Sequence, residues 1–237
     1  MDRITKKGEI EIIIRRVLAS EDVESMAKVL LKDILSFKVK FPLLEYAAHL
    51  LIDGLPSRYI YKMCDEVAAF NTIGGNVIIG IMLQSRLNSD KASALHYASK
   101  YMDQGAEWYV TDIIGERVFG YGMLVYFDEV FILIQQYAQH DSKWVVRAVG
   151  AGGHYAIKKG LDKESVDRLF ELLLSLANAR DHHIKTGIGW AAKTTARFHP
   201  EIIDKYRPLI IAGEGVGRWF IRKVNIGLKR HAYFNMI

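Results

Sequence analysis

The chain has 237 residues, half of them hydrophobic and a quarter charged, which suits one large globular domain or a short solenoid with a sizeable core. No uncharged apolar run approaches the ~18 residues of a membrane-spanning helix, and the opening MDRITKKGEIE lacks the apolar segment of a signal peptide. The single cysteine, Cys64, excludes an intramolecular disulfide and a multi-thiolate zinc site. We therefore expect a cytoplasmic protein that does not engage a membrane.

Positive charge is concentrated in the C-terminal part of the chain. Residues 1–142 hold 15 Lys and Arg against 19 Asp and Glu, a net charge of −4, whereas residues 143–237 hold 17 against 8, a net charge of +9. Such asymmetry favours a polyanionic partner for the C-terminal part. A solvated, lysine-rich helical surface without a partner is the alternative.

Apolar residues recur at helical spacing along most of the chain. They predict amphipathic or buried helices over 9–18, 22–36, 42–52, 57–70, 91–104, 124–139, 163–177 and 200–211. The stretch NVIIGIML (76–83) could be a buried strand, but the absence of partner strands favours a buried helix. All four prolines are expected where a helix starts or stops.

A repeat emerges when four aromatic residues are aligned. Trp108, Trp144, His183 and Trp219 open WYVTDIIG, WVVRAVGA, HIKTGIGW and WFIRKVNI at spacings of 36, 39 and 36 residues. This period matches one helical hairpin per repeat, with the aromatic residue at the start of the second helix. Hairpins of this kind stack, because one pair of helices cannot bury its apolar face alone.

The repeat predicts an all-α, curved superhelical solenoid of five or six helical hairpins. We expect a single domain over 1–237, with less regular hairpins over about 1–105 and clear repeats that carry the site over 106–237. A generic helical bundle in which the tryptophan spacing is coincidental is the alternative.

The glycines of KWVVRAVGAGGHYAIKKG (143–160) suggest a phosphate-binding loop at first sight. Helical spacing continues through them, however, since Arg147, Ala151, His154 and Lys158 form one stripe. An interior glycine costs roughly 1 kcal/mol relative to alanine, so close helix packing or close approach of a ligand should compensate. The sequence therefore predicts a helix, and His154 on its stripe either contacts phosphate or is structural.

Basic residues occupy this stripe in successive repeats. A line of cations on a concave surface suits a phosphate backbone. The residues expected to bind DNA phosphates are Arg147, Lys158, Lys193, Arg197, Arg222 and Lys229.

Asp112 is an acidic residue in this basic register, four residues after Trp108 and on the same helix face. A carboxylate there could stabilise the oxocarbenium-like sugar that forms when an N-glycosidic bond breaks, or orient the attacking water. Indole faces can hold a cationic group. Alternatively, Asp112 caps or salt-bridges a neighbouring helix and the tryptophans are core residues.

The stretches EWYVTDIIG, SKWVVRAVG and IKTGIGWAAKTTARFHPEII, within residues 105–230, resemble signatures of the AlkD-like DNA alkylation-repair glycosylases, which are HEAT-like repeat proteins. In this resemblance Trp108 and Asp112 match the family's Trp-x-x-x-Asp pair, Arg147 its groove arginine and Trp190 its second tryptophan. The aspartate would be catalytic and the tryptophans would flank the deoxyribose of the lesion. The segment SFKVKFPLLEYAAHLL lacks the family's Gly-x-x-x-Pro-x-x-Arg-like pattern, so the resemblance leaves open whether the N-terminal hairpins contact DNA.

The resemblance implies an all-α, right-handed superhelical solenoid of HEAT-like helical hairpins. It also implies a monomeric DNA glycosylase of base excision repair that acts without a metal or other cofactor. Its substrate would be double-stranded DNA containing cationic purines of the 3-methyladenine and 7-methylguanine type. A non-catalytic HEAT-like protein that binds damaged or branched DNA, or a protein scaffold, is the alternative.

Overall fold

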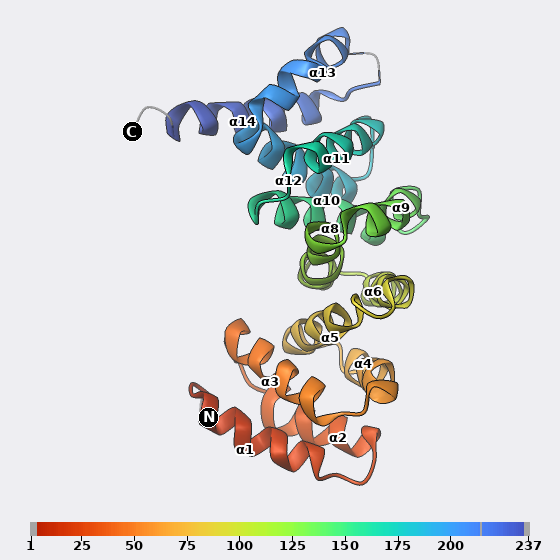
Figure 1. Cartoon of the computed structure of the whole chain (residues 1–237), viewed down its shortest axis with the longest axis vertical. Coiled ribbons are helices and arrows are strands. Elements are labelled where there is room, and N and C mark those ends of the chain that lie inside the picture. Colours follow the sequence, from red (N-terminus) through yellow and green to blue (C-terminus); the bar gives the residue numbers. More distant parts are fainter. Residues whose placement is uncertain (1–3, 214, 235–237) are drawn as a thin grey trace. The chain divides into compact units, whose positions relative to one another are not determined.

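The structure, a computed structural model, describes residues 4–213 and 215–234 (Figure 1). Within these ranges every regular element is a helix and none is a strand. The chain divides into two compact units, residues 1–105 and 106–237. The predicted all-α fold of stacked helical hairpins is confirmed, while the interpretation of the whole chain as one domain stays a prediction.

The first unit contains two rows of helices. In one row α1 packs on α3 and α3 on α5; in the other, α2 packs on α4 and α4 on α6. The helices are α1 (Lys7–Leu18), α2 (Val23–Leu30) with a π-helical extension (Leu31–Leu35), α3 (Phe41–Gly54), a 3-10 turn (Ser57–Tyr59), α4 (Ile60–Ala69), α5 (Ile73–Arg86) and α6 (Lys91–Gly105).

The stretch NVIIGIML lies inside α5, which confirms the expected buried helix. Thr72 caps its N-terminus, because the side-chain hydroxyl oxygen accepts a hydrogen bond of 3.0 Å from the backbone N–H of Gly75. Residues 75–83 are all buried, which explains why the segment carries no polar face and resembles a core strand in sequence.

The second unit stacks the second helices of the repeats on one another. The helix that begins the unit comprises α7 (Trp108–Gly115), a π-helical turn η3 (Glu116–Gly120) and α8 (Tyr121–Val125). The remaining helices are α9 (Phe127–Tyr137), α10 (Lys143–Lys158), α11 (Lys163–Ser175), α12 (His182–Phe198), α13 (Pro200–Ala212) and α14 (Arg218–Phe234). The second helices pack in the order α7–η3, α10, α12 and α14, and α9, α11 and α13 each pack against the second helices that flank them.

The aromatic repeat is confirmed in this unit. Trp108 is the first residue of α7, while Trp144, His183 and Trp219 are the second residues of α10, α12 and α14. The rings of Trp144 and His183 contact each other across α10 and α12, with centroids 4.3 Å apart. Equivalent positions of neighbouring repeats therefore meet in space, unlike in a bundle with coincidental spacing.

Close packing explains the glycines of α10, which is one continuous helix rather than a phosphate-binding loop. A Cβ on Gly150 would lie 2.1 Å from the backbone carbonyl carbon of Gly187 on α12. Conversely, a Cβ on Gly187 would lie 2.4 Å from the carbonyl oxygen of Arg147. The backbones of α10 and α12 touch at this point, which only glycine permits.

The proline prediction is correct for three of the four residues. Pro42 and Pro200 lie in the first turns of α3 and α13, and Pro56 precedes the 3-10 turn. The prediction is wrong for Pro208, which lies inside α13. Because proline has no N–H, the helix continues through Pro208 without the hydrogen bond to the carbonyl of Asp204.

Candidate functional site

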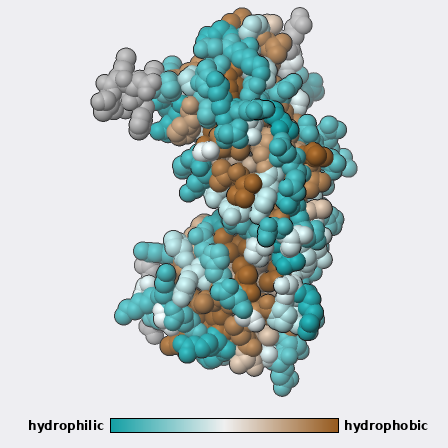
Figure 2. All heavy atoms as spheres, viewed as in Figure 1, coloured by the Kyte–Doolittle hydropathy of each residue, from teal (hydrophilic) through white to brown (hydrophobic). Residues whose placement is uncertain are grey.

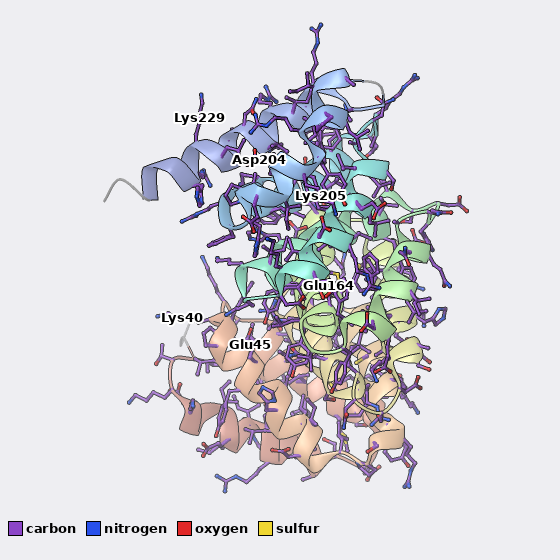
Figure 3. The ribbon with its side chains drawn as sticks, turned by 45° about the horizontal axis from the view of Figure 1, so that its top comes forward. Lys40, Glu45, Glu164, Asp204, Lys205 and Lys229 are labelled. Atoms are coloured by element: carbon purple, nitrogen blue, oxygen red, sulfur yellow. The ribbon has the colours of Figure 1, made fainter. Side chains whose placement is uncertain are left out.

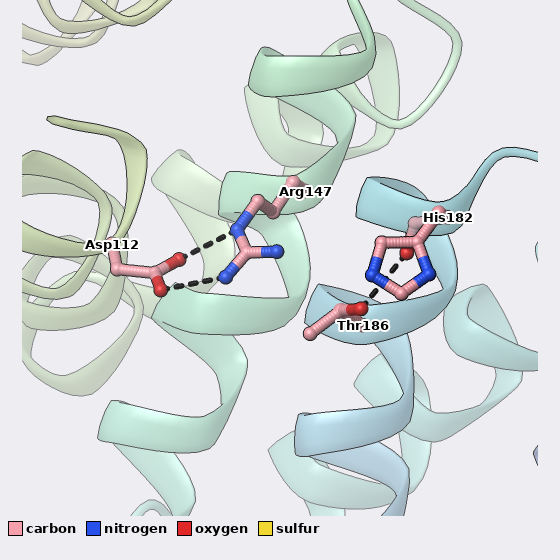
Figure 4. A network of polar contacts seen from close by, with 4 residues as sticks. All are labelled: Asp112, Arg147, His182 and Thr186. Atoms are coloured by element: carbon pink, nitrogen blue, oxygen red, sulfur yellow. Dashed lines mark hydrogen bonds and ion pairs between the residues drawn. The ribbon is translucent and has the colours of Figure 1, made fainter. Parts of the chain in front are cut away.

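The centre of the site is a buried ion pair between Asp112 on α7 and Arg147 on α10. Arg147 donates from Nε to Oδ1 of Asp112 at 2.8 Å and from Nη2 to Oδ2 at 2.7 Å (Figure 4). Asp112 is 8% exposed and Arg147 is 5% exposed. This bidentate geometry fixes the carboxylate in one orientation.

Small residues bring the two partners together. A Cβ on Gly115 would lie 3.2 Å from the Cβ of Ala148, so α7 and α10 approach closely one turn beyond the ion pair. On α12, Thr186 occupies the register of Arg147 and its hydroxyl donates to the carbonyl of His182 at 2.8 Å (Figure 4). The guanidinium of Arg147 is therefore directed at Asp112, while the Thr186 hydroxyl bonds to its own helix.

The sequence left open whether Asp112 is a functional carboxylate or a partner in a salt bridge between helices. The structure shows that it forms such a salt bridge. An ionised carboxylate offers about four acceptor positions, and Arg147 uses one on each oxygen. The pair thus joins α7 to α10, and each Asp112 oxygen keeps an acceptor position that Arg147 does not use.

Trp108 lies one helical turn before Asp112 and is 55% exposed. Its ring meets that of Tyr109 edge to face, with centroids 5.9 Å apart. The alternative that both tryptophans are core residues is therefore wrong for Trp108. An exposed indole beside a fixed carboxylate is available to contact a ligand.

Trp190 on α12 is half-buried and stacks on the imidazole of His154 on α10. The ring centroids are 4.8 Å apart and the ring planes differ by 4°. The Thr194 hydroxyl donates to the carbonyl of Trp190 at 2.9 Å, so its oxygen must accept from Nδ1 of His154 at 2.7 Å. This arrangement assigns the His154 proton to Nδ1.

His154 remains neutral at physiological pH. Burial, followed by the positive charges of Lys158 and Lys193, lowers its pKa to about 4. The stacked and hydrogen-bonded ring supports the structural interpretation of His154. One face of Trp190 is thereby held in position by an uncharged partner.

The expected phosphate-binding residues lie on three helices of the second unit. Lys158 is exposed at the end of α10, Lys193 and Arg197 are half-buried on α12, and Arg222 and Lys229 are exposed on α14. Lys229 projects outward from α14 in Figure 3. Arg147 differs from them, because its guanidinium is buried against Asp112.

Lys193 is surrounded by other cations. Burial lowers the pKa of Lys193, and the charges of Arg230, Lys223 and Arg197 lower it further. Lys223 and Arg230 were not assigned to the cations of the site from the sequence, although Gly189 was a signal for Lys223. A Cβ on Gly189 would lie 2.9 Å from Cγ of Lys223, so this glycine makes room for the lysine between α12 and α14.

A second carboxylate near the ion pair, Glu116, was also missed. It is half-buried, and its backbone N–H donates to the carbonyl of Asp112, which places the two residues one helical turn apart. Burial raises the pKa of Glu116, and the charge of Asp112 raises it further. The spacing of four residues was the available signal.

No group of three or more His, Cys, Asp and Glu side chains in the described part of the chain could hold a metal ion. Among the same residues, no helix is long and apolar enough to cross a membrane. Polar residues cover much of the face of the second unit seen in Figure 2, with apolar patches between them.

The stacked hairpins make this chain an all-α helical-repeat protein. Its second unit carries a cluster of cations and a buried Asp–Arg pair. The family model described as "DNA alkylation repair enzyme" matches residues 42–206. The chain therefore belongs to this family, which assigns it to the enzymes that repair alkylated DNA. The matched region includes Trp108, Asp112, Arg147 and Trp190. Searches of curated proteins and of solved structures return no match.

Proposed function

We propose that this protein is a monomeric DNA glycosylase of base excision repair. It excises cationic alkylated purines, of the 3-methyladenine and 7-methylguanine type, from double-stranded DNA by hydrolysing the N-glycosidic bond. The observation that carries the proposal is the fixed Asp112 carboxylate, one turn from the exposed indole of Trp108. Family membership supports a role in repair of alkylated DNA.

The chemistry requires stabilisation of a cationic sugar more than activation of a leaving group. When the bond between C1′ and the base nitrogen breaks, its electron pair neutralises the alkylated base, and positive charge develops on the deoxyribose. A preorganised carboxylate stabilises that charge without reorganising at the moment of reaction. Asp112 is suited to this role because Arg147 holds both of its oxygens.

The two tryptophans supply aromatic faces for the lesion nucleotide. Trp108 is exposed, and Trp190 is supported on one face by the neutral ring of His154. Aromatic faces pack on sugars and attract cations, with a contribution of about 0.5–2 kcal/mol for each cation–π contact. We assign both residues to the binding of the alkylated nucleotide.

The cations around Lys193 would bind the DNA backbone. Burial lowers the pKa of Lys193, repulsion from the neighbouring cations lowers it further, and phosphates relieve that repulsion when they approach. Arg147 can take part only through the guanidinium N–H groups that Asp112 leaves free, since the pair uses two of the five donors. We therefore assign the main phosphate contacts to Lys158, Lys193, Arg197, Arg222 and Lys229.

One observation favours a non-catalytic DNA-binding protein instead. The bidentate, buried contact of Asp112 with Arg147 has the geometry of a structural salt bridge. A protein that only binds DNA could retain the pair to join α7 to α10. The two functions differ in whether the base is released.

The test is release of 7-methylguanine from an alkylated duplex by the wild type and by Asp112→Asn. We expect release by the wild type, a strong reduction in the variant and retained binding of unmodified duplex by both. In Asp112→Asn, the amide N–H₂ of asparagine faces a donor of the Arg147 guanidinium, and two donors cannot form a hydrogen bond. Thermal unfolding must therefore show that the variant remains folded. Tight, salt-dependent DNA binding without base release by the wild type would establish the non-catalytic function, and the absence of both would favour a protein scaffold.

A further inference from the structure

Glu116 shares a helix face with Asp112. The backbone N–H of Glu116 donates to the Asp112 carbonyl, which is regular α-helical geometry with a rise of about 5.4 Å per turn. Residues four apart on a helix are neighbours on its surface. Trp108, Asp112 and Glu116 therefore form one line along α7 and into η3.

The two carboxylates differ in their partners. Both oxygens of Asp112 accept hydrogen bonds from Arg147, whereas the side chain of Glu116 has no hydrogen-bond or salt-bridge partner within residues 4–213 and 215–231. Burial is the main reason that the pKa of Glu116 is raised, and the negative charge of Asp112 adds to it. Arg117 on the same helix and Lys158 on α10 act in the opposite direction but do not cancel the increase.

Hydrolysis of a glycosidic bond has two separate requirements. Negative charge must stabilise the sugar cation, and a base must accept a proton from the attacking water. Asp112 is suited to the first and poorly suited to the second, because both of its oxygens already accept hydrogen bonds from the Arg147 guanidinium. Protonation of Asp112 would also leave the buried Arg147 without a counterion.

We propose that Glu116 is the general base that accepts the proton of the attacking water, while Asp112 stabilises the sugar cation. This inference rests on the proposed glycosylase function. The water oxygen forms a bond to C1′, and one proton of that water moves to an Oε atom of Glu116. The electron pair of the broken C1′–N bond leaves with the base, which becomes neutral. The products are the free base and an abasic site with a 1′-hydroxyl, and Glu116 later releases its proton to solvent.

DNA binding is expected to strengthen this base. Lys158 is one of the two cations that lower the pKa of Glu116, and it is also an expected phosphate ligand. A phosphate paired with Lys158 offsets that positive charge, so the pKa of Glu116 rises in the complex. Both kcat and kcat/KM should fall at low pH, where Glu116 becomes protonated, and we call this fall the acid limb. The acid limb of kcat reports the complex and that of kcat/KM reports the free enzyme, so the limb of kcat should lie at higher pH.

The experiment measures 7-methylguanine release by Glu116→Gln as a function of pH, at saturating and limiting enzyme. The matched control is Glu171→Gln, because Glu171 is an exposed glutamate on α11 outside the site. We expect Glu116→Gln to lose roughly 10²-fold in rate, the lower end of general-base contributions. It should also lose the acid limb and retain affinity for unmodified duplex. Glu116→Asp, which keeps a carboxylate at shorter reach, should fall between the wild type and Glu116→Gln and keep the limb.

The outcomes separate this inference from the proposed function. If the wild type releases no base, the glycosylase function itself fails. If the wild type is active and Glu116→Gln keeps its rate and its acid limb, the function stands and the role of Glu116 is refuted. If Glu116→Gln does not fold, the pH profiles of Glu116→Asp and the wild type decide. A purely structural glutamate would give no acid limb whose pH differs between kcat/KM and kcat.

Discussion

Replacement of Gly150 by alanine tests the backbone contact that positions the site. The new Cβ would lie 2.1 Å from the carbonyl carbon of Gly187, 2.2 Å from its oxygen and 2.4 Å from the nitrogen of Ile188. Carbon atoms in contact are separated by about 3.5–4.0 Å, so α10 and α12 must separate by roughly 1.5 Å. The obstacle is backbone, which cannot rotate away as a side chain could.

The magnitude follows from two opposing effects. Overpacking a well-packed core costs typically about 1–3 kcal/mol, occasionally more, and backbone contacts place this site at the upper end. Alanine regains about 1 kcal/mol of helix propensity relative to glycine. We expect Gly150→Ala to lower the free energy of unfolding by about 2 kcal/mol, measured by urea denaturation.

Gly8→Ala is the matched control, since Gly8 lies in α1 and a Cβ there meets nothing within 4 Å. It should leave stability unchanged or raise it by up to about 1 kcal/mol. Gly150→Ala should also slow base release, because the separation of α10 and α12 moves Trp190 relative to Asp112. An unchanged or increased stability of Gly150→Ala would refute the backbone contact.

Three further predictions concern the site itself. Arg147→Ala should lower the free energy of unfolding by about 3–5 kcal/mol near pH 7, because Asp112 is left buried and unpaired. Urea denaturation measures this loss, and a loss of only about 0–1 kcal/mol, as for an exposed ion pair, would contradict this account. Lys193→Gln should reduce the slope of log K against log salt for duplex binding by about 0.9 if the lysine contacts one phosphate, and an unchanged slope would remove it from the interface. His154 is neutral in the fold, with a pKa near 4 against an ordinary 6.5, so its contribution to stability is complete above pH 6.5 and decreases as the pH falls toward 4, by less than about 1.4 kcal/mol per pH unit for a partly exposed group. His154→Asn should lack that decrease, and the acid quenching of Trp190 fluorescence by the stacked imidazolium should vanish with it.

The sequence by itself determined the features that depend on neighbours along the chain. Apolar spacing located the helices, and the recurring aromatic residue at the start of the second helix revealed the repeat. Trp108 and Asp112 could be assigned to one helix face, because positions four residues apart are fixed by helix geometry alone. The glycines of α10 were placed correctly inside a helix for the same reason, since the helical stripe continued through them.

Only the tertiary structure decided which side chains meet across helices. Asp112 and Arg147 are 35 residues apart, and their pairing depends on how closely α7 and α10 approach at Gly115. Sequence placed Arg147 on an exposed basic stripe, but its guanidinium is buried, because a helix stripe does not specify the rotation of the helix against its neighbour. The cations around Lys193 likewise come together from α12 and α14. Charge clusters and ion pairs between repeats are properties of packing, and spacing within one helix cannot encode them.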